Sequence, residues 1–416
     1  MNSNVEYILK LLHSVLYDKP APIPDDDMDW LSALSVAGMG EVHTIIYKKI
    51  SELPKEKQPD DGLMGWLREQ TFRIGMEKLQ FYDLVSRILK EAKKQGIQVI
   101  LFKGPVVADL YPEPMLRKSC DMDMYVDPKS LKAFEKILVD FHFEKNIEHS
   151  KDVVPVYVLN KKFMIEAHCC LFEDYEGKRI EMLKEMDLTN KDRLVELSVS
   201  GLDITTMGHE DHLVFLLFHL IKHITYSGCS LKTIIDIALF VNAYGDQINK
   251  ASFWEKMKML GYENFCCTLF SICVRYFGMK KDILLDDTYS DSVAEISLAR
   301  MYEVGILKDG ASDQGEDRRA YSIVYQSLQG KEDKKISKIR MWKKTFFPGH
   351  KDLSFRYMYA RKHPSLVWIA WIHRGFNQLS VFFVKDKAQV ANVSKDMKLA
   401  NRKLALMKEL DLMNKD

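Results

Sequence analysis

The chain has 416 residues, of which 60 are Lys or Arg and 59 are Asp or Glu, so its formal net charge is only +1. This balance excludes binding of nucleic acid through the net charge of the whole molecule. A local basic patch that binds nucleic acid remains compatible with it. The length exceeds what one core usually fills and predicts two or three domains, and the 47% of hydrophobic residues is ordinary for a globular protein.

The seven cysteines indicate neither a disulfide framework nor a zinc site. Their number is odd, and they include the vicinal pairs at 169–170 and 266–267 but no Cys-x-x-Cys. The N-terminus lacks the basic and apolar blocks of a signal peptide. The most apolar windows, 213–224 and 366–384, are too short or too interrupted to span a bilayer. We therefore expect a cytoplasmic protein without a transmembrane segment.

The first 95 residues are predicted to be helical. Apolar residues recur with helical spacing over 5–16, 30–38 and 42–53, and Asp29 is a suitable residue to begin the second of these helices. One long amphipathic helix, or two shorter ones, is expected over 63–95 and ends at Gly96. This region leads the chain into the first predicted strand.

The stretch from 97 to 168 carries the predicted sheet. Residues 97–102 form a short apolar run rich in β-branched and aromatic side chains, and Lys103-Gly104-Pro105 ends it. A brief helical turn through Leu110 follows. The further elements expected here are strands at 120–126, 153–159 and 161–170, the last two forming a hairpin, and a helix at 129–141.

Ionisable side chains alternate with apolar ones in two of these strands. Because successive side chains of a strand point to opposite faces, Asp121 and Asp123 must share a face, and so must Glu166 and His168. Carboxylates held so close repel, and a fold tolerates them in water or around a cation. Three carboxylates on adjacent strands form a suitable cradle for hard divalent cations, which take oxygen ligands and bridge phosphates.

The order of these motifs resembles the signature of the uncharacterised nucleotidyltransferase family, within the polymerase-beta-like nucleotidyltransferase superfamily. The resemblance rests on Leu-Phe-Lys-Gly at 101–104, Tyr-Pro at 111–112, Arg-x-x-x-Asp-x-Asp-x-x-Val at 117–126 and Ile-Glu-x-His at 165–168, and it extends to about residue 378. It implies an α+β fold in which a Gly-containing turn holds the nucleotide triphosphate. An Asp-x-Asp strand and a third acidic residue would bind the metal.

Seven residues are candidates for the site, and the resemblance implies the metal-binding role of Asp121, Asp123 and Glu166. Catalysis would rest on Asp121, Asp123, Glu166 and Lys103, and the first three would bind Mg²⁺ or Mn²⁺. The nucleotide would be contacted by Lys103, Gly104, Arg117 and His168. The alternatives for the third acid are Glu148, Glu173 and Asp174, which lie outside the apolar strand.

Several of these residues also have plain structural interpretations. Arg117 could clamp a phosphate through two hydrogen bonds or be solvated in its loop. His168 could bind a metal-bound carboxylate or a phosphate, relay a proton, or be a core histidine with a satisfied partner. Pro105 replaces the second residue of the superfamily's Gly-Gly or Gly-Ser turn and has no N–H for a phosphate, which makes Lys103 the more plausible contact.

From residue 208 onward the chain is expected to be almost wholly helical. His212, His219 and His223 lie on one predicted helical face, where they could pack against the sheet or, through His219 and His223, bind a transition metal. His219, His223 and Asp236 also resemble recurrent positions of the family. The expected helices are 211–226, 231–244, 253–260, 265–277 and 290–305, followed after a break at 346–350 by an amphipathic stretch at 364–384 and a charged helix at 387–413.

A basic cluster lies between these helices, over 331–344. Aromatic residues flank it, so it could follow a phosphate backbone or lie weakly on an anionic surface, and a solvated linker is the plainer interpretation. The cluster consists of Lys331, Lys334, Lys335, Lys338, Arg340, Lys343 and Lys344.

The sequence therefore predicts an α+β nucleotidyltransferase with a small mixed sheet at 96–207. An N-terminal helical region at 1–95, a helical domain at 208–328 and a C-terminal segment at 329–416 surround it. The enzyme would transfer NMP from an NTP to an unidentified hydroxyl acceptor, which could be a sugar, another small molecule, a protein or RNA. Three alternatives remain open: transfer of the γ-phosphoryl group, a catalytically inactive nucleotide-binding or protein-interaction module, and an RNA-directed protein.

Overall fold

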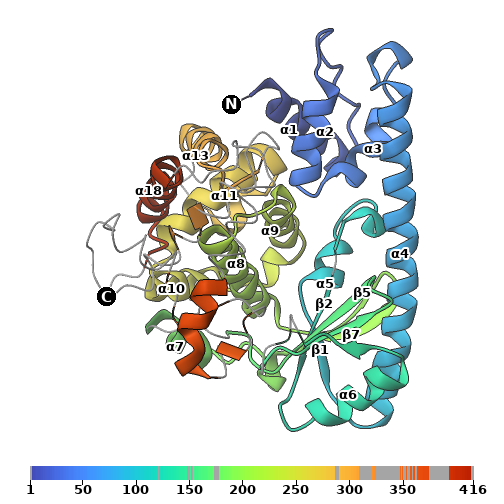
Figure 1. Cartoon of the computed structure of the whole chain (residues 1–416). Coiled ribbons are helices and arrows are strands. Elements are labelled where there is room, and N and C mark those ends of the chain that lie inside the picture. The colour runs from blue at the N-terminus through green and yellow to red at the C-terminus, as the bar shows by residue number, and fades with distance from the viewer. Residues whose placement is uncertain are drawn as a thin grey trace. The chain divides into compact units, whose positions relative to one another are not determined.

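Figure 1 shows the computed structural model of the chain, which divides into two compact units, 1–312 with 405–416 and 313–404. The domain boundaries expected at 95/96 and 207/208 lie inside the first unit and remain predictions. The described residues are 2–119, 121–147, 150, 153–172, 178–285, 290–308, 320, 321, 323, 324, 347, 349, 353, 357, 359, 360, 363–373 and 393–413. The basic cluster at 331–344 lies outside them.

The N-terminal helices form where the sequence predicts them. The Asp29 side chain accepts a hydrogen bond from the backbone N–H of Ser32 and so begins the second helix, while Gly96, at a φ of 69°, follows the fourth. The stretch over 63–95 is one helix rather than two. The four helices are α1 (Ser3–Leu16), α2 (Trp30–Met39), α3 (His43–Ser51) and α4 (Asp61–Lys94).

The sheet has seven strands in the order β3-β4-β5-β2-β1-β7-β6. The β2–β5 and β1–β7 pairs are parallel and the other four are antiparallel, so the predicted small mixed sheet is confirmed. The strands are β1 (Val99–Leu101), β2 (Asp121–Val126), β3 (Glu144–Lys145), β4 (Val156–Leu159), β5 (Phe163–His168), β6 (Val195–Val199) and β7 (Leu202–Thr206).

Two faces of the sheet have different roles. Met122 and Met124 on β2 are fully buried on one face. Figure 1 shows α4 running along the sheet from α3 to α6 (Leu131–Asp140). The other face, which carries Asp121 and Asp123, adjoins α8 (His209–Tyr226), because the rings of Phe102 and Phe215 are 4.9 Å apart. The acids therefore lie between the sheet and the helical part of the first unit.

The helical part follows the sequence prediction closely. The pair α8 and α9 (Leu231–Tyr244) packs beside the sheet, and most of their residues are buried. The further helices are α5 (Gly104–Ala108), α7 (Lys178–Glu185), α10 (Lys250–Leu260), α11 (Glu263–Phe277), α12 (Lys281–Leu284), α13 (Asp291–Glu303) and α18 (Val393–Glu409). Together with the mixed sheet they confirm the predicted α+β class.

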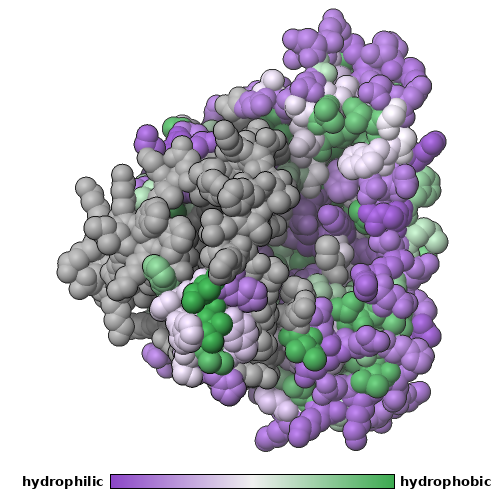
Figure 2. All heavy atoms as spheres, viewed as in Figure 1, coloured by the Kyte–Doolittle hydropathy of each residue, from purple (hydrophilic) through white to green (hydrophobic). Residues whose placement is uncertain are grey.

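The visible surface over α4 is mostly hydrophilic. Figure 2 shows separate hydrophobic residues among purple ones on this side, and the exposed apolar side chains of α4 include Phe72, Met76 and Leu79. Among the helices that the structure describes, none combines the length and the apolar character needed to cross a bilayer.

Candidate active site

The parallel pairing of β2 with β5 brings the predicted acids together. Asp123 lies opposite Glu166 in the register, and Asp121 lies opposite Met164, two positions earlier on the same face. The Asp123 side chain is almost fully buried, whereas the Glu166 side chain is 27% exposed. One acid is therefore fixed inside the fold and another reaches solvent.

The closest cluster in this region consists of Asp123, Glu166 and His168. One potential ligand atom from each lies within 4.8 Å of the others, an arrangement that could hold a metal ion. His168 Nε2 lies 3.0 Å from Asp123 Oδ1 and 3.4 Å from Glu166 Oε2. Asp121 is not a member of this compact group, although its charge acts on the same site. His168 thus contacts two of the three predicted carboxylates, in agreement with one of its interpretations from the sequence.

Lys103 stands at the end of β1 in a strained backbone conformation. Its φ of 57° and ψ of −111° are unfavourable for a residue with a side chain, and such strain is typical of functional sites. Its ammonium Nζ donates to Asp123 Oδ1 at 2.9 Å, and its backbone N–H donates to Nε2 of the buried His212 at 3.0 Å. Hydrogen bonds therefore fix both the backbone and the side chain of Lys103.

The turn after β1 differs from a phosphate-binding loop. The Lys103 N–H is already used by His212, and Pro105 has no N–H. Gly104 is buried at the first position of α5, and a Cβ there would lie 3.8 Å from the backbone oxygen of Asp121, which is ordinary contact. This turn therefore offers an anion the positive charge of Lys103 rather than a row of backbone N–H donors.

The electrostatics of the acids are uneven. Burial, together with repulsion by Asp123, raises the pKa of Asp121 to about 6. Burial also opposes the charge of Asp123, but Lys103 and the hydrogen bond from His168 outweigh it and hold the pKa of Asp123 well below its usual range. For His168, burial is outweighed by hydrogen bonds to Asp123 and Glu166, which raise the pKa of the imidazole. A bound cation would relieve the repulsion at Asp121.

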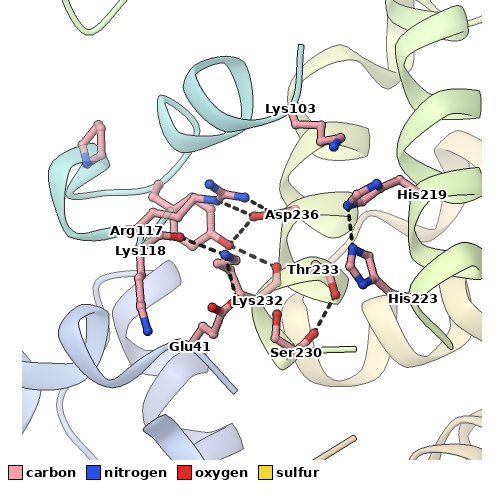
Figure 3. Close-up of polar contacts among 12 residues, drawn as sticks. Glu41, Lys103, Arg117, Lys118, His219, His223, Ser230, Lys232, Thr233 and Asp236 are labelled. Carbon is pink, nitrogen blue, oxygen red and sulfur yellow. Dashed lines mark hydrogen bonds and ion pairs between the residues drawn. The ribbon is translucent and has the colours of Figure 1, made fainter. Parts of the chain in front are cut away.

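Arg117 lies in a different environment from the predicted phosphate clamp. It is 5% exposed, and its Nε and Nη2 atoms donate to the two carboxylate oxygens of Asp236 at 2.7 and 2.5 Å (Figure 3). Tyr111 Oη also donates to Asp236, at 2.7 Å. The two-point interaction expected of Arg117 is thus made with a carboxylate of its own chain, and its contact with a nucleotide stays a prediction.

The loop before β2 is held by lysines from two other helices. Lys78 of α4 donates to the carbonyls of Pro114 and Arg117 at 2.9 and 2.8 Å. Lys232 of α9 donates to the carbonyl of Lys118 at 2.9 Å and pairs with Glu41 at 2.8 Å (Figure 3). Buried carbonyls need such donors. The loop and Asp121 after it are therefore fixed relative to α4 and α9.

The sequence contains a signal for one of these buried contacts. Asp236 is the lone acid in the largely apolar helix 231–244, and a buried carboxylate requires a partner. Its partner, Arg117, is 119 residues away, and no local spacing predicts that pairing. His212 packs against the sheet with a hydrogen bond, as predicted, but no pattern indicated that its partner is the Lys103 N–H.

His219 and His223 form a hydrogen-bonded pair on α8. Their Nε2 atoms are 2.9 Å apart, and Figure 3 shows the side chain of Lys103 extending toward α8, where both rings lie. Burial, with the charge of Lys103, lowers the pKa of both, to about 4 for His223. Both imidazoles are therefore neutral at physiological pH.

Comparison with known proteins gives one family match. A model described as an uncharacterised nucleotidyltransferase matches residues 26–278, which include β1, β2, β5, α8 and α9. The resemblance expected for residues 279–378 lies outside this match. A search of curated proteins found no match.

Three solved structures have low similarity to the chain. The antibiotic-resistance factor ANT(2'')-Ia is 14% identical, with a TM-score of 0.32 over 44% of this chain and 90% of that one. An antigenic nucleotidyltransferase-like protein from Paracoccidioides brasiliensis is 16% identical, with a TM-score of 0.27 over 39% and 75%. A tRNA nucleotidyltransferase, solved with a primer tRNA and an ATP analogue, is 12% identical, with a TM-score of 0.21 over 78% and 95%. At these TM-scores the likenesses carry no argument.

Proposed function

Because the chain belongs to the uncharacterised nucleotidyltransferase family, we propose that it transfers NMP from an NTP to a hydroxyl acceptor with the help of Mg²⁺ or Mn²⁺. The observation that carries this proposal is the convergence of Asp121, Asp123 and Glu166 on one face of β2 and β5, beside Lys103. The acceptor oxygen would attack the α-phosphorus, and pyrophosphate would leave.

The donor set fits a divalent cation. Asp123 and Glu166 offer oxygen ligands within 4.8 Å of each other, and Asp121 is a carboxylate whose charge is disfavoured by its surroundings. These three residues would hold the metal, with His168 beside Asp123 and Glu166. A bound ion would supply charge stabilisation and orient the phosphates.

Lys103 is the side chain best placed to contact phosphate. It is 14% exposed, and its ammonium lies 2.9 Å from Asp123 Oδ1. With Asp123 neutralised by a bound ion, the Lys103 ammonium would be free to turn toward a phosphate oxygen. One such preorganised donor is typically worth about 10²-fold to 10³-fold in rate.

The test is a transfer assay with NTP labelled at either the α- or the γ-phosphate. Purified full-length protein is incubated with Mg²⁺ or Mn²⁺ and a panel of hydroxyl acceptors, and wild type is compared with Asp121→Asn/Asp123→Asn. The proposal expects α-label on the acceptor and free pyrophosphate, both lost in the double variant. Asp203→Asn, at an exposed acid of β7, is the matched control and should keep wild-type activity.

The second candidate is a nucleotide-binding module without catalysis, favoured by Pro105 and by the engagement of the Lys103 N–H with His212. It predicts NTP binding that persists in the double variant and no turnover with any acceptor. If the acceptor gains the γ-label instead of the α-label, the site transfers the γ-phosphoryl group rather than NMP.

A further inference from the structure

A chain of hydrogen bonds runs along α8 away from the candidate active site. His219 Nε2 and His223 Nε2 are 2.9 Å apart, and His223 Nδ1 lies 3.1 Å from Ser227 Oγ. Ser227 follows the last residue of α8 and is exposed. Three groups that can each give and take a proton thus connect a half-buried imidazole to solvent.

The inner end of this chain lies beside the proposed catalytic groups. The His219 ring stacks on Phe215 with centroids 6.2 Å apart, and Lys103 Nζ lies 5.6 Å from the centroid of the same Phe215 ring. The charges of Lys103 and Asp123 both act on His219. Figure 3 shows Lys103 and His219 facing each other. His219 is therefore on the wall of α8 that faces the carboxylates.

Two sets of tautomers satisfy these hydrogen bonds, and one of them leaves His219 able to accept a proton. Ser227 Oγ can donate to the carbonyl of Gly228, at 3.2 Å, and so accept from His223 Nδ1–H. His223 Nε2 then accepts from His219 Nε2–H, which leaves the lone pair of His219 on Nδ1. A neutral imidazole with a free lone pair is what a general base requires.

Packing alone explains this arrangement less well. Phe215 and Leu220, which precede His219 and His223, respectively, on α8, are apolar, and an apolar side chain at 219 would extend that surface without a polar group to satisfy. The polar side chains instead continue, one turn after another, from the site to the surface.

We propose that His219 is the general base that takes the proton of the acceptor hydroxyl, and that His223 and Ser227 carry the charge to solvent. This inference rests on the proposed nucleotidyl transfer. The acceptor O–H bond breaks as its proton goes to His219 Nδ1, the oxygen forms a bond to the α-phosphorus, and the bond to pyrophosphate breaks. His219 passes its Nε2 proton to His223 Nε2, His223 passes its Nδ1 proton to Ser227 Oγ, and the hydroxyl proton of Ser227 leaves to water.

The experiment measures pyrophosphate release from Mn²⁺-NTP, with water and a panel of sugars as acceptors. His219→Ala is expected to lower kcat by roughly 10²-fold, the usual contribution of a positioned base, while the KM for NTP stays within about twofold. Added imidazole should restore part of kcat in this variant and leave wild type unchanged. Ser227→Ala should lower kcat less than His219→Ala, because water can accept the proton at an exposed end.

Controls separate this inference from folding defects and from the proposed function. His142→Asn, at an exposed histidine with a φ of 66°, should behave as wild type, since Asn tolerates that conformation. His219→Gln, which keeps a polar group of similar size, should have the thermal stability of wild type but the low kcat of His219→Ala.

The possible results lead to different conclusions. If wild type releases no pyrophosphate that depends on Asp123, the proposed function and the relay both fail. If Asp123→Asn is inactive while a folded His219→Ala keeps kcat within about twofold of wild type, or loses kcat without rescue by imidazole, the transfer stands and the relay is wrong.

Discussion

At the scale of single residues, the candidate site contains two carboxylates with opposite tendencies. Asp123 is held ionised by Lys103 and His168, at 2.9 and 3.0 Å. Asp121 has no such partner among the residues that the structure describes, and burial and repulsion from Asp123 raise its pKa to about 6. Without metal, the ionised carboxylate of Asp121 therefore destabilises the fold at neutral pH, and neutralising Asp121 removes this destabilisation.

Asp121→Asn is predicted to stabilise the metal-free protein at pH 8 by on the order of 1–2 kcal/mol, because the amide has no charge to desolvate or repel. An ordinary aspartate titrates near pH 4, and Asp121 in the fold near pH 6. Between these values the folded wild type binds a proton that the unfolded chain releases, so wild type loses stability as pH rises and the advantage of the variant grows. Urea unfolding in EDTA at pH 4.5 and pH 8 measures this difference.

Asp203→Asn, at the exposed acid on β7, is the control and should show no such pH dependence. Saturating Mg²⁺ should reduce the advantage of Asp121→Asn, since the cation relieves the same repulsion. An Asp121→Asn variant that is less stable than wild type at pH 8 without metal would contradict the assignment of Asp121 to the repulsive site.

At the scale of elements, the buried Arg117–Asp236 pair joins the loop before β2 to α9. Both side chains are less than 10% exposed, and Tyr111 adds a third hydrogen bond to Asp236. Such a pair is weak evidence for net stability, but breaking it leaves an uncompensated buried charge. Its location suggests that it positions the strand that carries the acids.

Asp236→Asn is predicted to lower the free energy of unfolding by about 3–5 kcal/mol, because the guanidinium of Arg117 stays buried without its counter-charge. The double variant Arg117→Met/Asp236→Leu should recover much of this loss, since neither charge remains. Asp291→Asn, which breaks the exposed pair with Arg275, should cost less than about 1 kcal/mol. A loss in the double variant equal to that of Asp236→Asn, measured by urea unfolding, would refute this explanation.

Gly278 is a second test of how the elements are joined. It ends α11 at a φ of 61°, and a Cβ there would lie 2.4 Å from the Tyr17 side chain, which donates to the carbonyl of Phe277 at 2.5 Å. Gly278→Ala is predicted to destabilise the fold by roughly 2–4 kcal/mol, through backbone strain and displacement of Tyr17.

The matched control is Gly65→Ala in α4, where an added Cβ meets nothing within 4 Å. It should stabilise the protein by about 0.5–1 kcal/mol, because alanine favours the helix. Thermal unfolding of both variants gives the comparison. Equal effects at the two positions would mean that Tyr17 does not hold α1 to α11 as the structure indicates.

The helices and strands differ in how well the sequence predicts them. Long helices and central strands were predicted because burial imposes a clear period on their side chains. The sequence did not predict β3, β6 or α7. β3 and β6 are edge strands paired on one side only, so they need no apolar run, and α7 is rich in charged residues.

At the scale of the whole molecule, the residues that meet at the site come from distant parts of the chain. The side-chain alternation of β2 and β5 predicts which residues share a face, and the structure brings Asp123 and Glu166 together across 43 positions of sequence. By contrast, the His212 bond to Lys103, the Arg117–Asp236 pair and the contacts of Lys78 depend on tertiary packing. No period or local motif encodes those contacts, so sequence reasoning missed them.

The arrangement of the first unit also limits where an acceptor can bind. The face of the sheet that carries the carboxylates adjoins α8, and α4 runs along the sheet (Figure 1). We therefore expect the side chains of α8, which include the proposed base His219, to contact an acceptor bound at the site. The identity of the acceptor would then depend on the helical part of the chain rather than on the sheet.

The most direct test of the central claim is a crystal structure of the full chain with Mn²⁺ and a non-hydrolysable NTP, with the metal located by its anomalous scattering. We predict manganese bound to carboxylate oxygens of Asp121, Asp123 and Glu166, the α-phosphate next to it, and Lys103 turned from Asp123 to a phosphate. Nucleotide bound elsewhere, or no manganese at these acids with the Lys103–Asp123 pair intact, would contradict the account.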